Sequence, residues 1–138
     1  RNILLDVMST KEVGWAPTNP WFSKGFKHLQ AYTLDNVTIN ILPVAFYLAS
    51  KFAAYTARAV DPRTSHDFED IIYILDNRKT LVHDILESDP VVKSFIIDQL
   101  KILREDVFLQ EAVLAHLEPS TQIQRFEMLI KKLQEITK

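Results

Sequence analysis

Five charged side chains lie close together in the middle of the sequence. Lys51 and Arg58 are seven residues apart, so on a helix both would lie on one face. A short turn follows, and then Asp67, Glu69 and Asp70 stand at the start of a second helical segment. Basic groups opposite carboxylates can clamp two helices together, or they can form half of a site that handles phosphates. The sequence therefore allows a structural and a phosphate-binding interpretation of this region.

The structural interpretation needs no chemistry. Asp67 and Asp70 are three residues apart and share a helix face, whereas Glu69 points elsewhere. Acidic groups in the first turn of a helix are stabilised by the helix dipole, typically by about 0.3–1 kcal/mol each. Asp70 could also pair with Lys51, and removing one partner of such a pair when it is buried costs ~3–5 kcal/mol. Either effect would explain the acidic residues without a reaction.

Composition limits the function classes. The 138 residues are 47% hydrophobic and 25% charged, which is typical of a folded domain with its own core. A net charge of −2 gives no basic excess for a nucleic-acid surface. The chain has no cysteine, which excludes disulfides and thiolate chemistry and favours a cytoplasmic setting. No apolar run approaches the roughly 20 residues of a membrane helix, so we expect no membrane partner.

Residues 1–42 have β character. The apolar run of residues 3–8, interrupted only by Asp6, predicts a buried strand. Residues 29–34 and 37–42 flank Asp35-Asn36, and both turn residues tolerate the left-handed conformation of a two-residue hairpin. Because chains rarely begin within a strand, we expect residues 1–42 to be the C-terminal strands of a sheet whose earlier part precedes Arg1.

Residues 43–138 have helical periodicity. Apolar positions recur every three or four residues, which predicts a bundle of about five helices. The predicted fold class is therefore α+β and predominantly helical, with a short strand and a β-hairpin at the N-terminus followed by this bundle.

Capping residues set the predicted helix boundaries. Pro43 suits the first turn of the first helix, and Ser65 is a good N-cap for the second. A short helix over 80–88 is expected to bury Leu86. A helix starting at Asp89-Pro90 is expected to continue over 107–117 after a kink. Thr121 with Gln124 has the spacing of a capping box for the last helix.

The order of these features resembles a known family. A strand with a central Asp precedes a Trp-containing loop, and a hairpin leads to residues 49–54 (ASKFAA), which fit the pattern Ala-x-Lys-Phe/Leu-x-Ala. An Arg-containing linker and residues 65–71 (SHDFEDI) follow. As far as Arg78, the chain resembles the C-terminal part of AbiEii-type nucleotidyltransferase-like proteins, a branch of the polymerase-β-like superfamily.

The resemblance implies an activity and a site. Enzymes of this kind transfer a nucleotidyl group from a nucleoside triphosphate (NTP) with the help of Mg²⁺. It implies that Asp6, Lys51 and Asp70 are catalytic, that Asp6 is a metal ligand, and that Lys51, Arg58 and Asp67 bind the nucleotide. The Gly-Ser motif and Asp-x-Asp pair of the family are absent from these residues. We therefore expect this chain alone to be catalytically incomplete.

The sequence also suggests partners for the parent protein and two alternatives to nucleotide transfer. The parent protein could be the toxin of a toxin–antitoxin pair, and its acceptor could be a tRNA, a protein or a small molecule. A non-enzymatic alternative is that residues 91–138 bind an antitoxin, or that the chain forms a homodimer through strand pairing. A third interpretation takes His66-Asp67 as the doublet of an HD-type phosphohydrolase, although His28 and Asp84 match its other ligands poorly.

Overall fold

The computed structural model describes residue 11 and residues 18–138, and its fold is α+β and mostly helical, as predicted. The predicted strand at 3–8, with Asp6, lies outside the described residues. The elements in chain order are α1 (Pro20–Gly25), the 3₁₀ helix η1 (Phe26–His28), β1 (Gln30–Leu34), β2 (Val37–Ile41), α2 (Val44–Arg58), α3 (His66–Asn77), α4 (Leu81–Leu86), α5 (Pro90–Glu105), α6 (Leu109–Leu114) and α7 (Gln122–Ile136).

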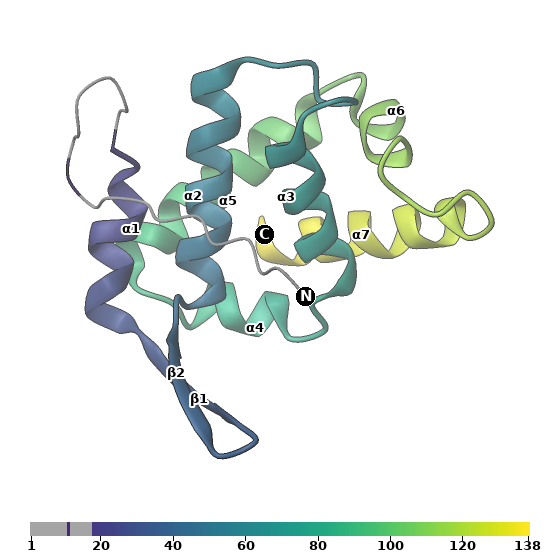
Figure 1. The fold of residues 1–138 in the computed structure, drawn as a ribbon. Coiled ribbons are helices and arrows are strands. Elements are labelled where there is room, and N and C mark those ends of the chain that lie inside the picture. The colour runs from purple at the N-terminus through teal and green to yellow at the C-terminus, as the bar shows by residue number, and fades with distance from the viewer. Residues whose placement is uncertain (1–10, 12–17) are drawn as a thin grey trace.

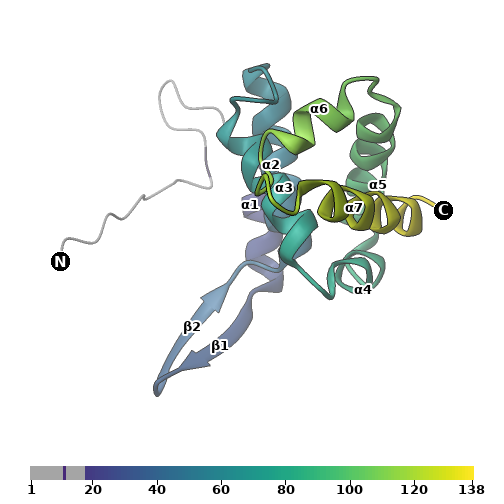
Figure 2. The same cartoon turned by 90° about the vertical axis from the view of Figure 1, so that its right-hand side faces the viewer.

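The predicted hairpin is confirmed. β1 and β2 pair antiparallel, with Gln30 opposite Ile41 and Leu34 opposite Val37. Asp35 and Asn36 have φ values of 48° and 64°, the left-handed conformation that a tight hairpin turn requires. All ten strand residues are exposed, and the hairpin projects from the helices as an arm (Figures 1 and 2). Within the described part of the chain, the sheet contains these two strands.

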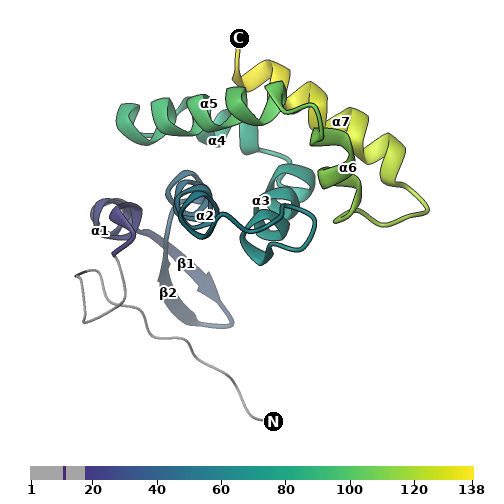
Figure 3. The same cartoon turned by 90° about the horizontal axis from the view of Figure 1, so that it is seen from above.

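The helices form two layers (Figure 3). Helices α1, α2 and α3 lie side by side in one layer, and α4, α5 and α7 cover them in the second. The core lies between the layers. Its largest fully buried side chains come from both: Leu48, Phe68, Ile71, Ile72, Leu75, Leu81, Ile85, Val92, Ile96, Leu100, Leu129 and Leu133. No helix in the described part of the chain is long and apolar enough to cross a membrane.

Helix α2 is the central element of the first layer. It contacts α1, α3, α4 and α5, and it begins at Val44, so Pro43 is its N-cap residue and lies one position before the first turn in which it was predicted. The small residues Ala45 and Ala49 are buried and let its neighbours approach closely. The close fit extends to Gly25 in α1, because a Cβ atom added there would lie only 2.9 Å from Cβ of Phe46. α2 is therefore held in place by packing on several sides.

Two predicted helix starts are confirmed by side-chain caps. Ser65 Oγ accepts a hydrogen bond from the backbone N–H of Phe68 at 3.2 Å. Asp89 Oδ1 accepts one from the N–H of Val91 at 2.9 Å, and α5 then begins at Pro90. Both caps satisfy amide groups that have no partner within the helix.

Three predictions about the helical half were wrong. Leu86 is 38% exposed, because Leu81 and Ile85 already occupy the buried face of α4 and Leu86 lies a further 100° around the helix. The capping box at Thr121 does not form: its backbone is not extended (φ −128°, ψ 2°), and its side chain makes no capping bond. Helix α5 does not continue through 107–117. It ends at Glu105, and Asp106 caps a turn that leads into the separate helix α6.

Candidate functional site

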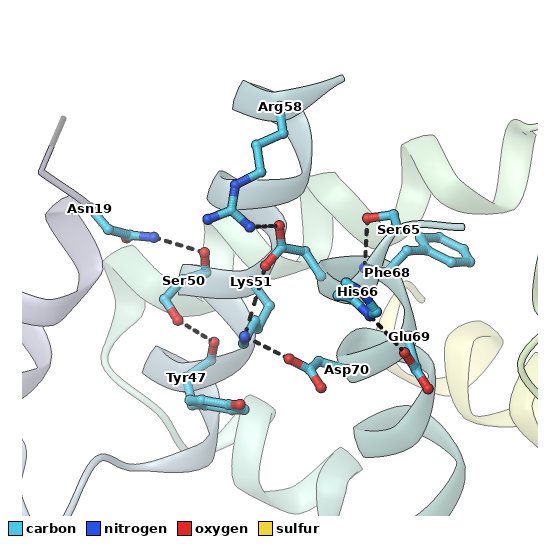
Figure 4. A network of polar contacts seen from close by, with 11 residues as sticks. Asn19, Tyr47, Ser50, Lys51, Arg58, Ser65, His66, Phe68, Glu69 and Asp70 are labelled. Carbon is cyan, nitrogen blue, oxygen red and sulfur yellow. Dashed lines mark hydrogen bonds and ion pairs between the residues drawn. The ribbon is translucent and has the colours of Figure 1, made fainter. Parts of the chain in front are cut away.

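Lys51 lies between two carboxylates of α3. Its Nζ atom is 2.6 Å from Oδ2 of Asp70 and 3.8 Å from Oδ1 of Asp67. Helical spacing predicted that Asp67 and Asp70 share a helix face, and one interpretation of the sequence paired Asp70 with Lys51. Both are confirmed, and Figure 4 shows the contact between Lys51 and Asp70.

Arg58 completes the group from the C-terminal end of α2. Its Nη1 atom donates a hydrogen bond to Oδ2 of Asp67 at 2.5 Å. Asp67 is thus contacted by both cations of α2, and its side chain is only 7% exposed. Arg58, by contrast, is 65% exposed. We call Lys51, Arg58, Asp67 and Asp70 the α2–α3 charge cluster.

The start of α3 explains why these carboxylates face α2. The Ser65 cap fixes the first turn, and Phe68 and Ile71 anchor the apolar face of the helix in the core. Asp67 and Asp70 then lie on the flank next to α2. This arrangement follows from helical spacing alone once the apolar face is buried.

His66 and Glu69 lie outside the cluster. Nδ1 of His66 is 3.3 Å from Oε2 of Glu69, and the His66 side chain is 95% exposed. His66 therefore points into solvent, beside Glu69 (Figure 4), while its neighbour Asp67 contacts Lys51 and Arg58 of α2. The two side chains of the predicted HD doublet diverge and do not converge on one ion.

The sequence did not reveal the residues that support Lys51 from α1. Asn19 donates from Nδ2 to the carbonyl oxygen of Ser50 at 2.8 Å, and its Oδ1 accepts from the N–H of Trp21 at 3.2 Å. Ser50 Oγ in turn donates to the carbonyl oxygen of Tyr47 at 2.7 Å. Asn19 directly before Pro20 is a typical N-cap and N1 pair, which signals the start of α1 but not the contact with Ser50.

Lys51 remains a cation at neutral pH. Burial lowers its pKa, but the hydrogen bond with Asp70 and the nearby Tyr47, Asp70 and Asp67 groups outweigh this effect, so the Lys51 pKa lies above its ordinary value. The ammonium also lies 5.5 Å from the centre of the Tyr47 ring, where a cation is favoured. Lys51 is therefore suited to neutralising a phosphate, and not to removing a proton.

The carboxylates of the cluster do not fit a metal site. Mg²⁺ prefers several oxygen ligands whose charge is not already neutralised. Asp67 and Asp70 are in contact with cations, and in the described ranges no three His, Cys, Asp or Glu side chains are arranged to hold a metal. The predicted metal ligand Asp6 lies outside the described residues.

Two hollows lie elsewhere on the surface. One, of about 420 Å³, lies at the base of the hairpin and is lined by His28, Arg78, His83 and Asp84, among others. The second, of about 330 Å³, lies between Tyr55, Arg63 and Phe108. The lining of neither hollow includes a residue of the α2–α3 charge cluster, which lies on the open flank of α2 and α3.

No protein-family model matches the chain, and no curated protein or solved structure matches it either. The resemblance to AbiEii-type proteins therefore remains a prediction that depends on residues 49–54 and 65–71. The geometry of the cluster is an independent observation, because the distances between Lys51 and the α3 carboxylates do not depend on any relative.

Proposed function

We propose that this chain is part of a cytoplasmic AbiEii-type nucleotidyltransferase, in which Lys51 contacts the phosphates of the bound NTP. The observation that carries the proposal is the position of Lys51 between Asp67 and Asp70. Residues 49–54 supply this lysine and residues 65–71 supply these aspartates. In the structure the lysine ammonium and the two carboxylates lie within contact distance. The Lys51 side chain is still 24% exposed, so a ligand can reach it.

The charges of the cluster balance, so a phosphate must compete for Lys51. Asp67 is buried and held by Arg58, and it has no freedom to leave. Asp70 is 43% exposed and can exchange its contact with Lys51 for contacts with water. In the proposed mechanism Asp70 positions the ammonium in the free protein and gives way when the triphosphate arrives. Arg58 keeps guanidinium donors free for a second phosphate, because the contact with Asp67 uses one of five.

The proposed reaction assigns a charge-stabilising role to Lys51. The acceptor attacks the α-phosphorus, the bond to the bridging oxygen of the β-phosphate breaks, and pyrophosphate leaves with the negative charge. A fixed cation near these oxygens stabilises the charge that develops. Mg²⁺ would supply further neutralisation, held by Asp6 and by carboxylates that the family carries earlier in its sequence. We therefore expect the 138-residue chain alone to give no transfer.

A transfer assay tests this proposal. The longest protein that the gene encodes is incubated with an NTP labelled at the α-phosphate, with total cellular RNA and the protein itself as acceptors. We expect label on one acceptor with the unaltered protein and with Lys51→Arg, and a loss of about 100-fold with Lys51→Met. Lys101→Met is the control, because Lys101 is an exposed lysine on α5. Equal labelling by the Lys51→Met and Lys101→Met proteins would refute the role of Lys51.

A further inference from the structure

The β1–β2 hairpin carries its large apolar side chains on one face. Directly opposed residues of an antiparallel pair lie on the same face, and successive residues alternate. The register pairs Tyr32 with Ile39 at the centre of the arm. One face is therefore formed by Gln30, Tyr32, Leu34, Val37, Ile39 and Ile41, and the other by Ala31, Thr33, Thr38 and Asn40. On the second face, the hydroxyl groups of Thr33 and Thr38 hydrogen-bond at 2.9 Å. We call the first the apolar face of the hairpin.

The apolar face has no cover within the described part of the chain. Its five large side chains are between 40% and 62% exposed. A two-stranded hairpin by itself is only marginally stable in water, and contiguous exposed apolar patches of this kind usually mark interaction sites. The opposite face is polar and suits solvent. An apolar partner that covers this face would therefore stabilise the hairpin.

The charges around the arm favour a second copy of the same chain. The strands contain no charged residue, and Asp35 at the tip is the one charge between positions 30 and 41. Lys27 and His28 lie in the 3₁₀ helix η1 at the base of the arm, before β1 begins at Gln30. An antiparallel pair of arms would bring Asp35 of each copy toward Lys27 of the other, whereas a parallel pair would bring the two Asp35 carboxylates together.

We propose that the apolar face of the hairpin binds the same face of a second copy of this chain, with the two arms antiparallel about a two-fold axis near Tyr32 and Ile39. A specific interface buries about 1,000 Å² or more in all, and a face formed by two five-residue strands is a small contact by that measure. The dimer is therefore expected to be reversible and dependent on concentration. The proposal is independent of nucleotide transfer.

Single cysteines test the interface cleanly, because the chain has no cysteine of its own. Ile39→Cys places a thiol at the centre of the apolar face, beside the proposed axis. Thr38→Cys is the matched control, since it is the adjacent residue on the same strand and points to the opposite face. Under mild oxidation we expect Ile39→Cys to form a disulfide-linked dimer and Thr38→Cys to remain monomeric. Circular dichroism verifies that both variants are folded.

Charge reversal tests the orientation. Asp35→Lys is expected to shift the monomer–dimer equilibrium in sedimentation toward monomer, as is Lys27→Asp, and the double variant is expected to restore the dimer. A chain that stays monomeric to millimolar concentration, or equal cross-linking through positions 38 and 39, would overturn the proposal. A monomer whose Ile39→Cys thiol resists alkylation would also overturn it, because residues of the same chain would then cover the face.

Discussion

The Nζ atom of Lys51 lies 2.6 Å from Oδ2 of Asp70, and this contact joins α2 to α3 at the surface of the charge cluster. Asp70 is 43% exposed, whereas Asp67, which contacts the same ammonium at 3.8 Å, is 7% exposed. The cluster thus has a buried carboxylate that ties the helices together and an exposed one that can be exchanged. This difference leads to distinct expectations for the two aspartates.

Asp67→Asn should destabilise the protein more than Asp70→Asn. Losing the buried carboxylate weakens its hydrogen bond from Arg58 and its ion pair with Lys51, and should cost about 1.5–3 kcal/mol. The Asp70 contact is partly solvated, so its loss should cost about 0.2–1 kcal/mol. Urea unfolding of the purified variants measures both free energies. Asp98→Asn, on the exposed side of α5, is the control and should change stability little. Equal losses at positions 67 and 70 would contradict this division of the cluster.

Ser65→Ala and Thr121→Ala should differ although both positions were predicted to cap helices. Ser65 makes its capping bond, so its loss should cost about 1 kcal/mol. Thr121 makes no capping bond, so its substitution should be nearly neutral. Thermal and urea unfolding of the pair give the comparison. A cost at Thr121 as large as that at Ser65 would mean that the capping box forms in solution.

These two positions show what the sequence could and could not predict. Ser65 and Thr121 have similar patterns, but a cap depends on the backbone angles of the capping residue, and tertiary packing sets those angles. Helical spacing correctly placed Asp67 and Asp70 on one face of α3, because helical period is a local property. Their contact with Lys51 also depends on how α2 packs against α3, and it was one of the interpretations that the sequence allowed. The tie from Asn19 to Ser50 spans 31 positions, and no local pattern specifies such a long-range contact.

The carboxyl group of Asp61 should titrate near pH 2. Hydrogen bonds from the side chain and backbone of Arg63 lower the pKa of Asp61 from 3.8 to about 2. Because the folded-state pKa is lowered, the stabilisation from this contact is present above pH 3.8 and is lost as the pH falls toward 2. Carbon-detected NMR titration measures the value. In Arg63→Gln the pKa of Asp61 should return toward 3.8, and an unchanged value there would refute the assigned cause.

Gly25→Ala should destabilise the contact between α1 and α2. The new methyl group would clash with Cδ1 of Leu42 and lie 2.9 Å from Cβ of Phe46, which cannot move without its backbone. Overpacking of this kind typically costs about 1–3 kcal/mol. Ser23→Ala, on the exposed side of α1, is the control and should stay within about 0.5 kcal/mol. Unfolding midpoints measure both, and a neutral Gly25→Ala would show that α1 is loosely held.

The central claim is that Lys51 binds the phosphates of an NTP, and the most direct measurement is the dissociation constant of an NTP in the presence of Mg²⁺. Isothermal titration calorimetry on the longest protein that the gene encodes gives this value for the unaltered, Lys51→Met and Lys101→Met proteins. We predict that Lys51→Met weakens binding by about tenfold or more, equivalent to ~1.4 kcal/mol. Lys101→Met should leave binding unchanged. A folded Lys51→Met protein that binds the NTP as tightly as the Lys101→Met protein would contradict the account, as would an unaltered protein that binds no NTP.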